Sequence, residues 1–294
     1  MIGTAMTDFT YDGIEVDREF GPWDYPLKER ISRHLEAVEN SFPWHRGKSP
    51  WGPPIAPPSI LMVATRRFLD SIGALPPGTV HIEHELEAMS ALRLDRRLIG
   101  YGRFTDKYAR DGRRYAVFEA KYRTQTGLII GHSRTKVALP ETGNNAAARE
   151  REDARAGAGE LEDISRTLTQ EKIAAYSEDT TDAANGKSIQ LQSAVAKKAG
   201  YEGIMAEELM AADYVSELMT GVFGQSWFLT GRMSLAFLRP ALCDDTLTTN
   251  GRVTERIDQG SVTRRVYQVW CQSQQGETVA LGAASGLLPT AGQP

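Results

Sequence analysis

The chain has 294 residues, of which 34 are Lys or Arg and 38 are Asp or Glu, so its formal net charge is −4. This length fits two ordinary domains better than one. The charge balance leaves no basic excess for neutralising a nucleic-acid backbone, which excludes a typical nucleic-acid-binding protein. Apolar residues make up 41% of the chain and charged residues 24%, a composition typical of folded globular proteins.

Hydropathy and cysteine content narrow the class further. No run approaches the roughly eighteen apolar residues that a membrane-spanning helix requires. The first twenty residues carry acidic groups where a signal peptide would have a basic start and an apolar stretch. We therefore expect a cytoplasmic protein with no membrane partner. Cys243 and Cys271 lack metal-binding spacing, so we expect two free thiols, no metal site and no cofactor.

An internal repeat organises the chain. The segment GRFT at 102–105 matches GRVT at 251–254, which begins 149 positions later. The same offset pairs Asp95 with Asp244, Leu98 with Leu247, Gly127 with Gly276, and Leu139-Pro140 with Leu288-Pro289. Several coincidences at one offset indicate a duplicated unit.

Each copy predicts one helix followed by an antiparallel meander. The first copy has apolar residues at helical spacing over Ser59–Ile72, and the second over Glu208–Phe223. Strand patterns follow in the first copy at Val80–Met89, Leu98–Lys107, Tyr115–Arg123 and Leu128–Leu139. They follow in the second at Met233–Leu238, Thr246–Ile257, Thr263–Gln272 and Thr278–Leu287. The order predicts an α+β fold in which each helix lies across one face of a sheet.

The segment between the copies predicts a linker. Residues 144–160 include seven charged residues and no aromatic or β-branched one, so they bury little surface. We expect an N-terminal domain over 1–143, a linker over 144–160 and a C-terminal domain over 161–294. Thr167 followed by Gln170 predicts a capping box for a helix that runs to about Tyr176.

Three segments carry a resemblance to a known family. They are GPPIAPPSIL at 52–61, DKYARDGRRYAVFEAKYRT at 106–124 and FGQSWFLTGRMSLAFLRPALCDDTL at 223–247. Together with the repeat, the chain resembles the MaoC-like (R)-specific enoyl-CoA hydratase and acyl dehydratase family in its double-hotdog form. The resemblance implies a double hotdog fold, an acyl-CoA or acyl-carrier thioester as partner, and reversible addition of water to a 2-enoyl thioester. It also implies an Asp and a His in a D-x-N-P-x-H loop of the second copy, and thioester binding by backbone N–H groups in an I-A-H-G-M pattern at the helix start.

The corresponding loop of the second copy lacks the family's dyad. It reads YSEDTTDAANGKSIQLQ at 176–192. Counting forward places Asp182 at the family's Asp, whereas counting backward places Asn185 at the Asp and Gln190 at the His. All five histidines lie in the first copy, at positions 34, 45, 81, 84 and 132. Because an amide does not exchange a proton near neutral pH, Gln190 cannot replace the His. A histidine and an acid brought over this cleft from the other copy would contradict the loss of the dyad.

The helix start of the second copy is altered as well. In GIMAEELM at 203–210, Glu207 and Glu208 replace the family's His and Gly. The simpler interpretation is that both are first-turn residues facing solvent. The alternative is that Glu207 acts with an acid of the loop that contains Glu178, Asp179 and Asp182. By position, the residues expected to contact substrate are Gly203, Met205, Ala206, Tyr214 and Trp227, although Tyr214 and Trp227 also fit a core.

The first copy offers a second candidate. In ENSFPWH at 39–45, Asn40 and a Pro precede His45 with the spacing of the D-x-N-P-x-H motif. Glu39 and His45 could form a displaced acid/base pair, although a surface or core-rim histidine is the simpler interpretation. In VHIEHELE, strand alternation places His81 and His84 on opposite faces of an exposed, charged strand, with no joint metal site.

These observations leave three functions open. The first is a lyase of the hydratase/dehydratase kind with redirected catalytic residues. The second is a catalytically inactive hotdog subunit that supports an active homologue in a homo- or hetero-oligomer. The third is a thioesterase in which Gln190 and Asp182 orient water.

Overall fold

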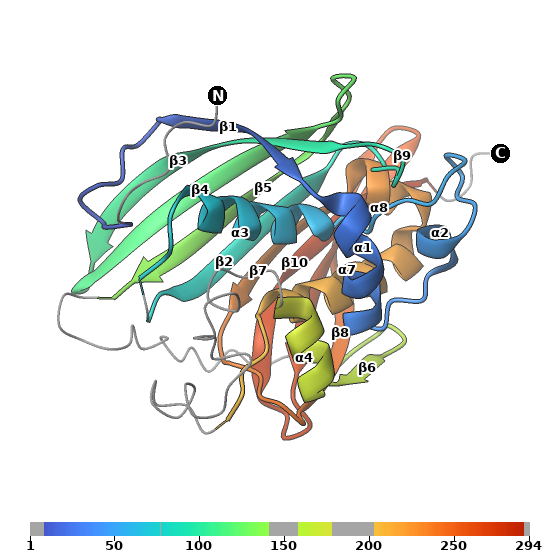
Figure 1. Ribbon diagram of the computed structural model, residues 1–294. Helices are drawn as coiled ribbons and strands as arrows, with labels where there is room; N and C mark the ends of the chain where they lie inside the picture. The colour runs from blue at the N-terminus through green and yellow to red at the C-terminus, as the bar shows by residue number, and fades with distance from the viewer. Residues whose placement is uncertain (1–8, 77, 141–157, 178–202, 291–294) are drawn as a thin grey trace.

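The computed structural model describes residues 9–76, 78–140, 158–177 and 203–290. In this part of the chain the strands form one ten-stranded antiparallel sheet in the order β1-β3-β4-β5-β2-β7-β10-β9-β8-β6 (Figure 1). The strands of the first copy occupy one half of the sheet and those of the second copy the other.

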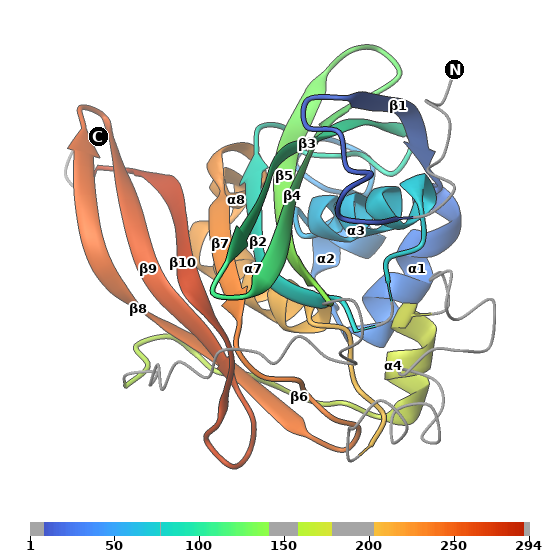
Figure 2. The ribbon, with the colours of Figure 1, turned by 90° about the vertical axis from the view of Figure 1, so that its left-hand side faces the viewer.

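The first copy wraps its strands around one long helix. Its elements are β1 Glu19–Tyr25, α1 Leu27–Ala37, α2 Pro43–Arg46, α3 Ile60–Ile72, β2 Val80–Ala88, β3 Leu98–Arg110, β4 Arg113–Arg123 and β5 Ile129–Leu139. Helix α3 buries ten of its 13 residues, which follows from the nearly continuous apolar run that predicted it. In Figure 2, α1 and α3 lie to one side of the strands of this copy.

The second copy repeats the arrangement. Its elements are β6 Ile164–Thr167, α4 Gln170–Ser177, α7 Leu209–Phe223, α8 Gln225–Thr230, β7 Arg232–Phe237, β8 Thr246–Gln259, β9 Val262–Gln272 and β10 Thr278–Pro289. Both long helices begin and end within one residue of their predicted bounds.

The strand registers reproduce the sequence repeat. Ile99 pairs with Arg123 between β3 and β4, and the residues 149 positions later, Thr248 and Gln272, pair between β8 and β9. Each of these ladders has a register shift at the same place, after Phe104 in the first copy and after Val253 in the second. The offset seen in the sequence therefore joins structurally equivalent positions.

The two copies are joined through the middle of the sheet. Strands β2 and β7 pair antiparallel from Glu83 with Ala236 to Glu87 with Arg232. The buried apolar side chains of both halves belong to one continuous core. Helices α1 and α4, one from each copy, pack against each other near its edge (Figure 1). Polar groups carried by these helices can therefore meet across the boundary between copies.

Two local predictions were wrong. Helix α4 begins after Thr169, whose hydroxyl accepts a hydrogen bond from the Lys172 N–H at 3.3 Å, and not after Thr167. Thr167 instead ends β6, where its hydroxyl lies 2.9 Å from that of Thr246. Thr167, which the sequence pattern assigned to the helix cap, is thus used for pairing between β6 and β8. Strand β6 itself was not predicted, and neither were β1, α1 and α2.

The second error concerns His81 and His84. Both are buried, and His84 Nδ1 lies 3.0 Å from His81 Nε2, so the two rings share a face. A register shift between His81 and Glu83 inserts one residue into β2 and breaks the alternation that would have separated them. The glutamates of this strand face outward, where Glu83 pairs with Lys136 and Glu85 with Arg134.

Two further findings bear on the class of protein. No helix in the described ranges combines the length and the apolar character needed to cross a membrane. Cys243 and Cys271 are free cysteines, as predicted.

Candidate functional site

A cluster of buried polar side chains lies where α1, α3, α4 and α7 meet. Its members are His34, Arg67, Tyr176, Glu207 and Asp213, and each is no more than 7% exposed. Two come from the first copy and three from the second. Burying such groups is costly unless they pair, so their partners define what the cluster can do.

The centre of the cluster is a histidine paired with an acid. His34 Nε2 lies 3.2 Å from Asp213 Oδ1, and the Tyr176 hydroxyl donates to Asp213 Oδ2 at 2.6 Å. The rings of His34 and Tyr176 also contact each other, with centroids 5.2 Å apart. Burial, reinforced by the Asp213 charge, raises the pKa of Tyr176 well above its usual value, so the phenol stays a donor near neutral pH. Asp213 is therefore an acceptor that fixes the orientation of both rings.

A buried ion pair completes the cluster. Arg67 Nη2 lies 3.1 Å from both carboxylate oxygens of Glu207, and it also donates to the Tyr176 carbonyl at 3.3 Å. Burial acts to lower the pKa of Arg67, but the adjacent charges of Glu207 and Asp70 outweigh it and raise that pKa. The interpretation of Glu207 as a solvent-facing first-turn residue was therefore wrong. The Glu207 side chain can be buried because Arg67, from the other copy, forms an ion pair with its carboxylate.

Local sequence explains how each group reaches the cluster. In α1, His34 shares the buried face with Leu27, Ile31 and Leu35. Asp213 belongs to α7, where almost every side chain is buried, so the helix carries a carboxylate into the core. Tyr176 lies in the last turn of α4.

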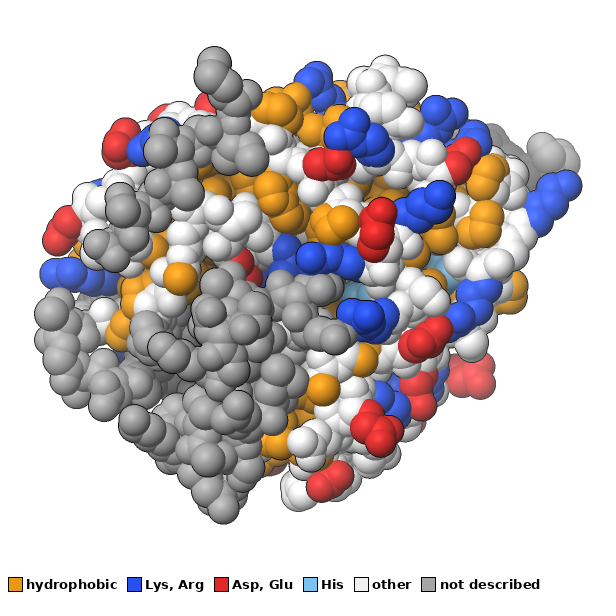
Figure 3. All heavy atoms as spheres, in the orientation of Figure 1, with side chains coloured by type: hydrophobic (Ala, Val, Ile, Leu, Met, Phe, Trp, Pro, Cys, Tyr) orange, Lys and Arg blue, Asp and Glu red, His pale blue; other side chains and the backbone are white. Residues whose placement is uncertain are grey.

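A small opening leads from the surface to this cluster. It is lined by Tyr25, Arg30, Arg33, His34, Val63, Arg67, Ala175 and Tyr176. Its interior volume is about 10 Å³, which is roughly the space that one water molecule needs. On the face shown in Figure 3, Lys and Arg side chains lie over α1 with acidic side chains between them. His34 and Tyr176 are thus within reach of a small group that enters from outside.

The start of α7 adjoins the ion pair. Met205 forms an isolated antiparallel β-bridge with Leu242, and the Ala206 N–H donates to the Ala241 carbonyl at 2.9 Å. The Ala206 N–H is therefore occupied by the backbone. The Glu207 N–H makes no hydrogen bond within the described part of the chain, so it is a donor that a ligand oxygen could use.

The remaining residues predicted for the second copy divide into two groups. Asp182, Asn185 and Gln190, with the neighbouring acids Glu178 and Asp179, lie outside the described residues.

The other predicted contacts lie in or beside α7 and α8. Tyr214 and Trp227 are fully buried, and the Trp227 indole donates to the Ser216 hydroxyl at 3.0 Å. Gly203 is half-buried, and a Cβ added there would meet no atom of the described residues within 4 Å. Tyr214 and Trp227 thus occupy core positions.

His45 of the first copy is buried and not at the surface. Its Nδ1 donates to the Ile55 carbonyl at 2.8 Å, whereas Nε2 has no hydrogen-bond partner among the described residues. Burial lowers the pKa of His45 to about 4, so the ring is neutral near pH 7. Glu39 does not pair with it but lies 2.8 Å from Lys172 Nζ. Asn40 accepts a hydrogen bond from the Phe42 N–H and shapes the loop.

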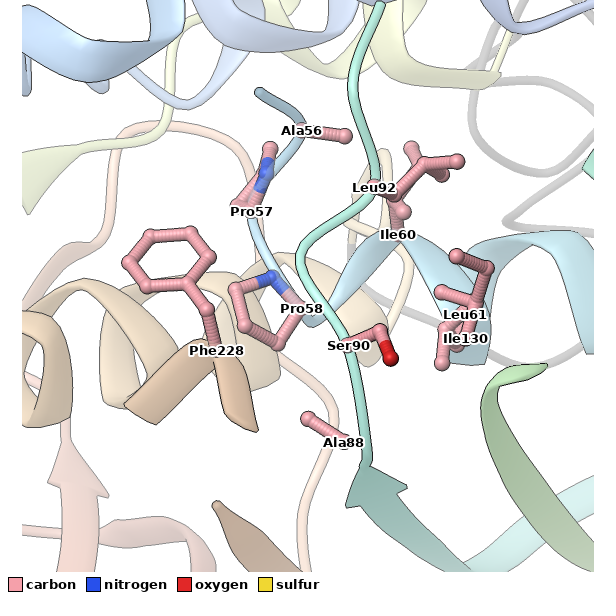
Figure 4. Close-up of a pocket in the computed structure, with 10 residues that line it drawn as sticks. All are labelled: Ala56, Pro57, Pro58, Ile60, Leu61, Ala88, Ser90, Leu92, Ile130 and Phe228. Carbon is pink, nitrogen blue, oxygen red and sulfur yellow. The ribbon is translucent and has the colours of Figure 1, made fainter. Parts of the chain in front are cut away.

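An apolar hollow lies beside this histidine at the start of α3. Figure 4 shows the Phe228 ring next to Pro57 and Pro58, with Leu92 and Ile130 on the other side. Pro57 and Pro58 have no N–H, so this helix start offers two donors fewer than usual. The hollow is lined mostly by apolar side chains, and its interior volume is about 10 Å³, roughly the space that one water molecule needs.

Among the residues that the structure describes, no three His, Cys, Asp or Glu side chains are placed to bind a metal ion.

His34, Arg67 and Asp213 were not singled out in the sequence. Asp213 had a detectable signal, since it is one of only two acids, with Glu217, within the apolar period of the second long helix. His34 shares a helical face with apolar residues, but α1 itself was not predicted. Nothing in the spacing shows that the two residues, 179 positions apart, would meet.

Comparisons with known proteins place this geometry in a fold family. No family model matches the chain, and no curated protein sequence matches it. Among solved structures, a MaoC-like dehydratase superposes with a TM-score of 0.71 at 13% identity, covering 96% of this chain and all of the other. A MaoC-like dehydratase from Phytophthora capsici gives 0.69 at 12% identity, covering 97% and 100%. A conserved hypothetical protein from Mycobacterium tuberculosis with a double hotdog fold gives 0.66 at 12% identity, covering 96% and 99%.

These likenesses confirm the predicted fold. The chain is an α+β protein with a double hotdog fold, and in structure it is similar to MaoC-like dehydratases. At such low identity they establish the architecture, and the chemistry has to be argued from the site itself.

Proposed function

We propose that the protein binds an acyl thioester, from coenzyme A or an acyl carrier, and acts as a hydratase/dehydratase-like lyase. The observation that carries this proposal is the contact between His34 and Asp213, 3.2 Å apart beneath an opening to solvent. It supplies a histidine and a carboxylate, the residue types that the family uses, from positions outside the altered loop. The catalytic residues are thus redirected, with the histidine contributed by the first copy.

The chemistry needs one group that exchanges protons. His34 takes a proton from water as the water oxygen bonds to the β-carbon of a 2-enoyl thioester. The double-bond electrons move toward the thioester carbonyl, and His34 then returns the proton to the α-carbon. Asp213 orients the ring and stabilises its charged form, and Tyr176 holds the far side of the carboxylate.

The start of α7 can stabilise the negative charge that develops on the thioester oxygen. A bare carboxylate at Glu207 would repel that oxygen. Arg67 instead neutralises Glu207, which lies two residues before α7, next to the positive end of the helix dipole. The charge pairing across the two copies therefore makes the second cleft compatible with an oxyanion.

The test is an assay for hydration of a 2-enoyl-CoA, in which the reaction is measured as the loss of absorbance of the conjugated double bond. We expect His34→Gln and Asp213→Asn each to lower kcat by about 10²- to 10⁴-fold, the usual contribution of a proton-transfer group. His132→Gln is the matched control, because His132 is partly exposed and pairs with Glu87 on the outer face. Wild-type turnover in His34→Gln would refute the assignment.

Two other outcomes separate the alternatives. Release of free thiol without hydration would support a thioesterase. The absence of any turnover by the wild type, with thioester binding intact, would support an inactive subunit.

A further inference from the structure

A second group of charged residues lies one helical turn from the proposed acid/base pair. Helix α7 carries Glu217 four residues after Asp213, so the two carboxylates lie on the same side of that helix. Helix α4 carries Lys172 four residues before Tyr176, and Glu39 comes two residues after the end of α1. Three of the helices that form the polar cluster therefore lead to this second group as well.

Arg166 of β6 joins these residues across the boundary between copies. Its Nη2 lies 3.3 Å from Glu217 Oε1 of the second copy, and its Nε lies 3.7 Å from Glu39 Oε2 of the first. Lys172 Nζ lies 2.8 Å from the same Glu39 oxygen. Arg166 also donates from Nη1 to the Ser165 carbonyl at 3.0 Å, and β6 is paired with β8. The guanidinium is thus anchored to the sheet while it contacts one acid from each copy.

Solvent reaches the pair of Arg166 and Glu217 only partly. The Arg166 side chain is 23% exposed and that of Glu217 is 14% exposed. Salt and water therefore screen this attraction less than they screen a surface ion pair. A planar guanidinium also presents its N–H donors in a fixed fork, so it can fix the direction of two carboxylates, whereas an ammonium acts as a point charge. The contacts of Arg166 are thus suited to setting a geometry as well as to adding stability.

We propose that Arg166 is a positioning residue for the reaction, which holds α1 and α7 so that His34 stays within hydrogen-bond distance of Asp213. This inference rests on the proposed function, because it assigns Arg166 an effect on the step that His34 carries out. Arg166 acts through Glu39, which follows the helix of His34, and through Glu217, which lies one turn from Asp213. A displacement of either helix by about 1 Å would lengthen the 3.2 Å contact between His34 and Asp213 beyond a normal hydrogen bond.

Glu217 makes this contact with α7 depend on pH. Burial raises the pKa of the Glu217 carboxyl to about 7, Arg166 acts against this shift, and the charges of Asp213 and Glu39 add to it. Above that pH Glu217 is ionised, and Arg166 binds it as an ion pair. Below that pH the carboxyl is neutral, and a hydrogen bond to a neutral acceptor is weaker. Arg166 therefore holds α7 more tightly in the ionised state of Glu217.

The test compares kcat for hydration of a 2-enoyl-CoA between wild type and Arg166→Met at two pH values. At about pH 8.5 we expect kcat to fall by about 10- to 100-fold with KM little changed, the range for a misplaced catalytic group. At about pH 6 the loss should be about fivefold smaller, because the ion pair is already weakened in wild type. In a Glu217→Gln background the same substitution should give a loss that does not vary with pH. Arg252→Met, which changes an exposed cation on β8, is the control and should keep wild-type kcat.

Two results would overturn the positioning role. One is wild-type kcat in an Arg166→Met variant that is less stable in urea, and the other is a loss of kcat that is equal at both pH values. If the wild type hydrated no 2-enoyl-CoA, the proposed function would fail, but the ¹⁵N NMR signals of the His34 imidazole would still report its hydrogen bond to Asp213. Signals that move in Arg166→Met and stay in Arg252→Met would support the positioning role, and signals that stay in both would refute it.

Discussion

At the scale of single residues, the contact between Arg67 and Glu207 decides the character of the second cleft. Both side chains are less than a tenth exposed, and each belongs to a different copy. Removing one partner leaves the other charged and buried, which typically costs 3–5 kcal/mol. The pair therefore stabilises the boundary between copies in addition to neutralising the helix start.

We expect Glu207→Ala to lower the free energy of unfolding by about 3 kcal/mol. Urea denaturation measures this value. The double variant Arg67→Met with Glu207→Leu should recover most of the loss, because no uncompensated charge is left. Asp24→Ala is the exposed control, and loss of its pair with Arg97 should cost far less, because solvent screens exposed ion pairs. A Glu207→Ala cost as small as that of Asp24→Ala would contradict the buried pair.

At the scale of elements, two buried histidines make folding depend on pH. Burial lowers the pKa of His45 to about 4 and shifts the pKa of His84 downward as well. In the unfolded chain both histidines would become protonated as the pH falls through about 6.5. Below that pH the unfolded state binds protons that the folded state does not, so stability is present above pH 6.5 and is lost as the pH falls.

The effect of His45 alone is about 1.4 kcal/mol for each pH unit between 6.5 and 4. We expect the free energy of unfolding to drop by about 2 kcal/mol from this residue between pH 7 and pH 5. In His45→Gln the drop should shrink by that amount. An identical pH profile in His45→Gln and wild type would contradict the burial of His45.

The helices and strands also show which elements hydrophobic periodicity predicts and which it does not. The helical spacing of apolar residues predicted α3 and α7 to within one residue, because a buried helix needs an unbroken apolar face. Alternation failed at His81, because the extra residue in β2 is set by pairing with β5 and not by local propensity. The cap at Thr169 was missed for a similar reason, since pairing of β6 with β8 occupies Thr167.

At the scale of the whole molecule, the duplication creates the site. Neither copy holds the pair of His34 and Asp213 by itself. The two residues meet because α1 of the first copy and α7 of the second both contribute to one shared core. A sequence examined copy by copy reveals the missing histidine of the second loop, but it does not reveal the histidine that the other copy supplies.

The continuous sheet and core predict that the two copies unfold together. Tryptophans report on each half separately, with Trp23, Trp44 and Trp51 in the first copy and Trp227 and Trp270 in the second. Variants that keep tryptophan in only one copy should each show one transition, and the midpoint by fluorescence should equal the midpoint by circular dichroism in the same variant. Separate transitions for the two halves would show that the copies are independent domains.

The central claim is that the redirected acid/base pair lies against the reacting carbons of a thioester. The most direct measurement is a crystal structure of the protein with a bound 3-hydroxyacyl-CoA. We expect the hydroxyl-bearing β-carbon in the second cleft, with its oxygen within about 3 Å of the His34 imidazole. A complex in which the acyl carbons lie beside His45 in the first cleft, far from His34 and Asp213, would contradict the account.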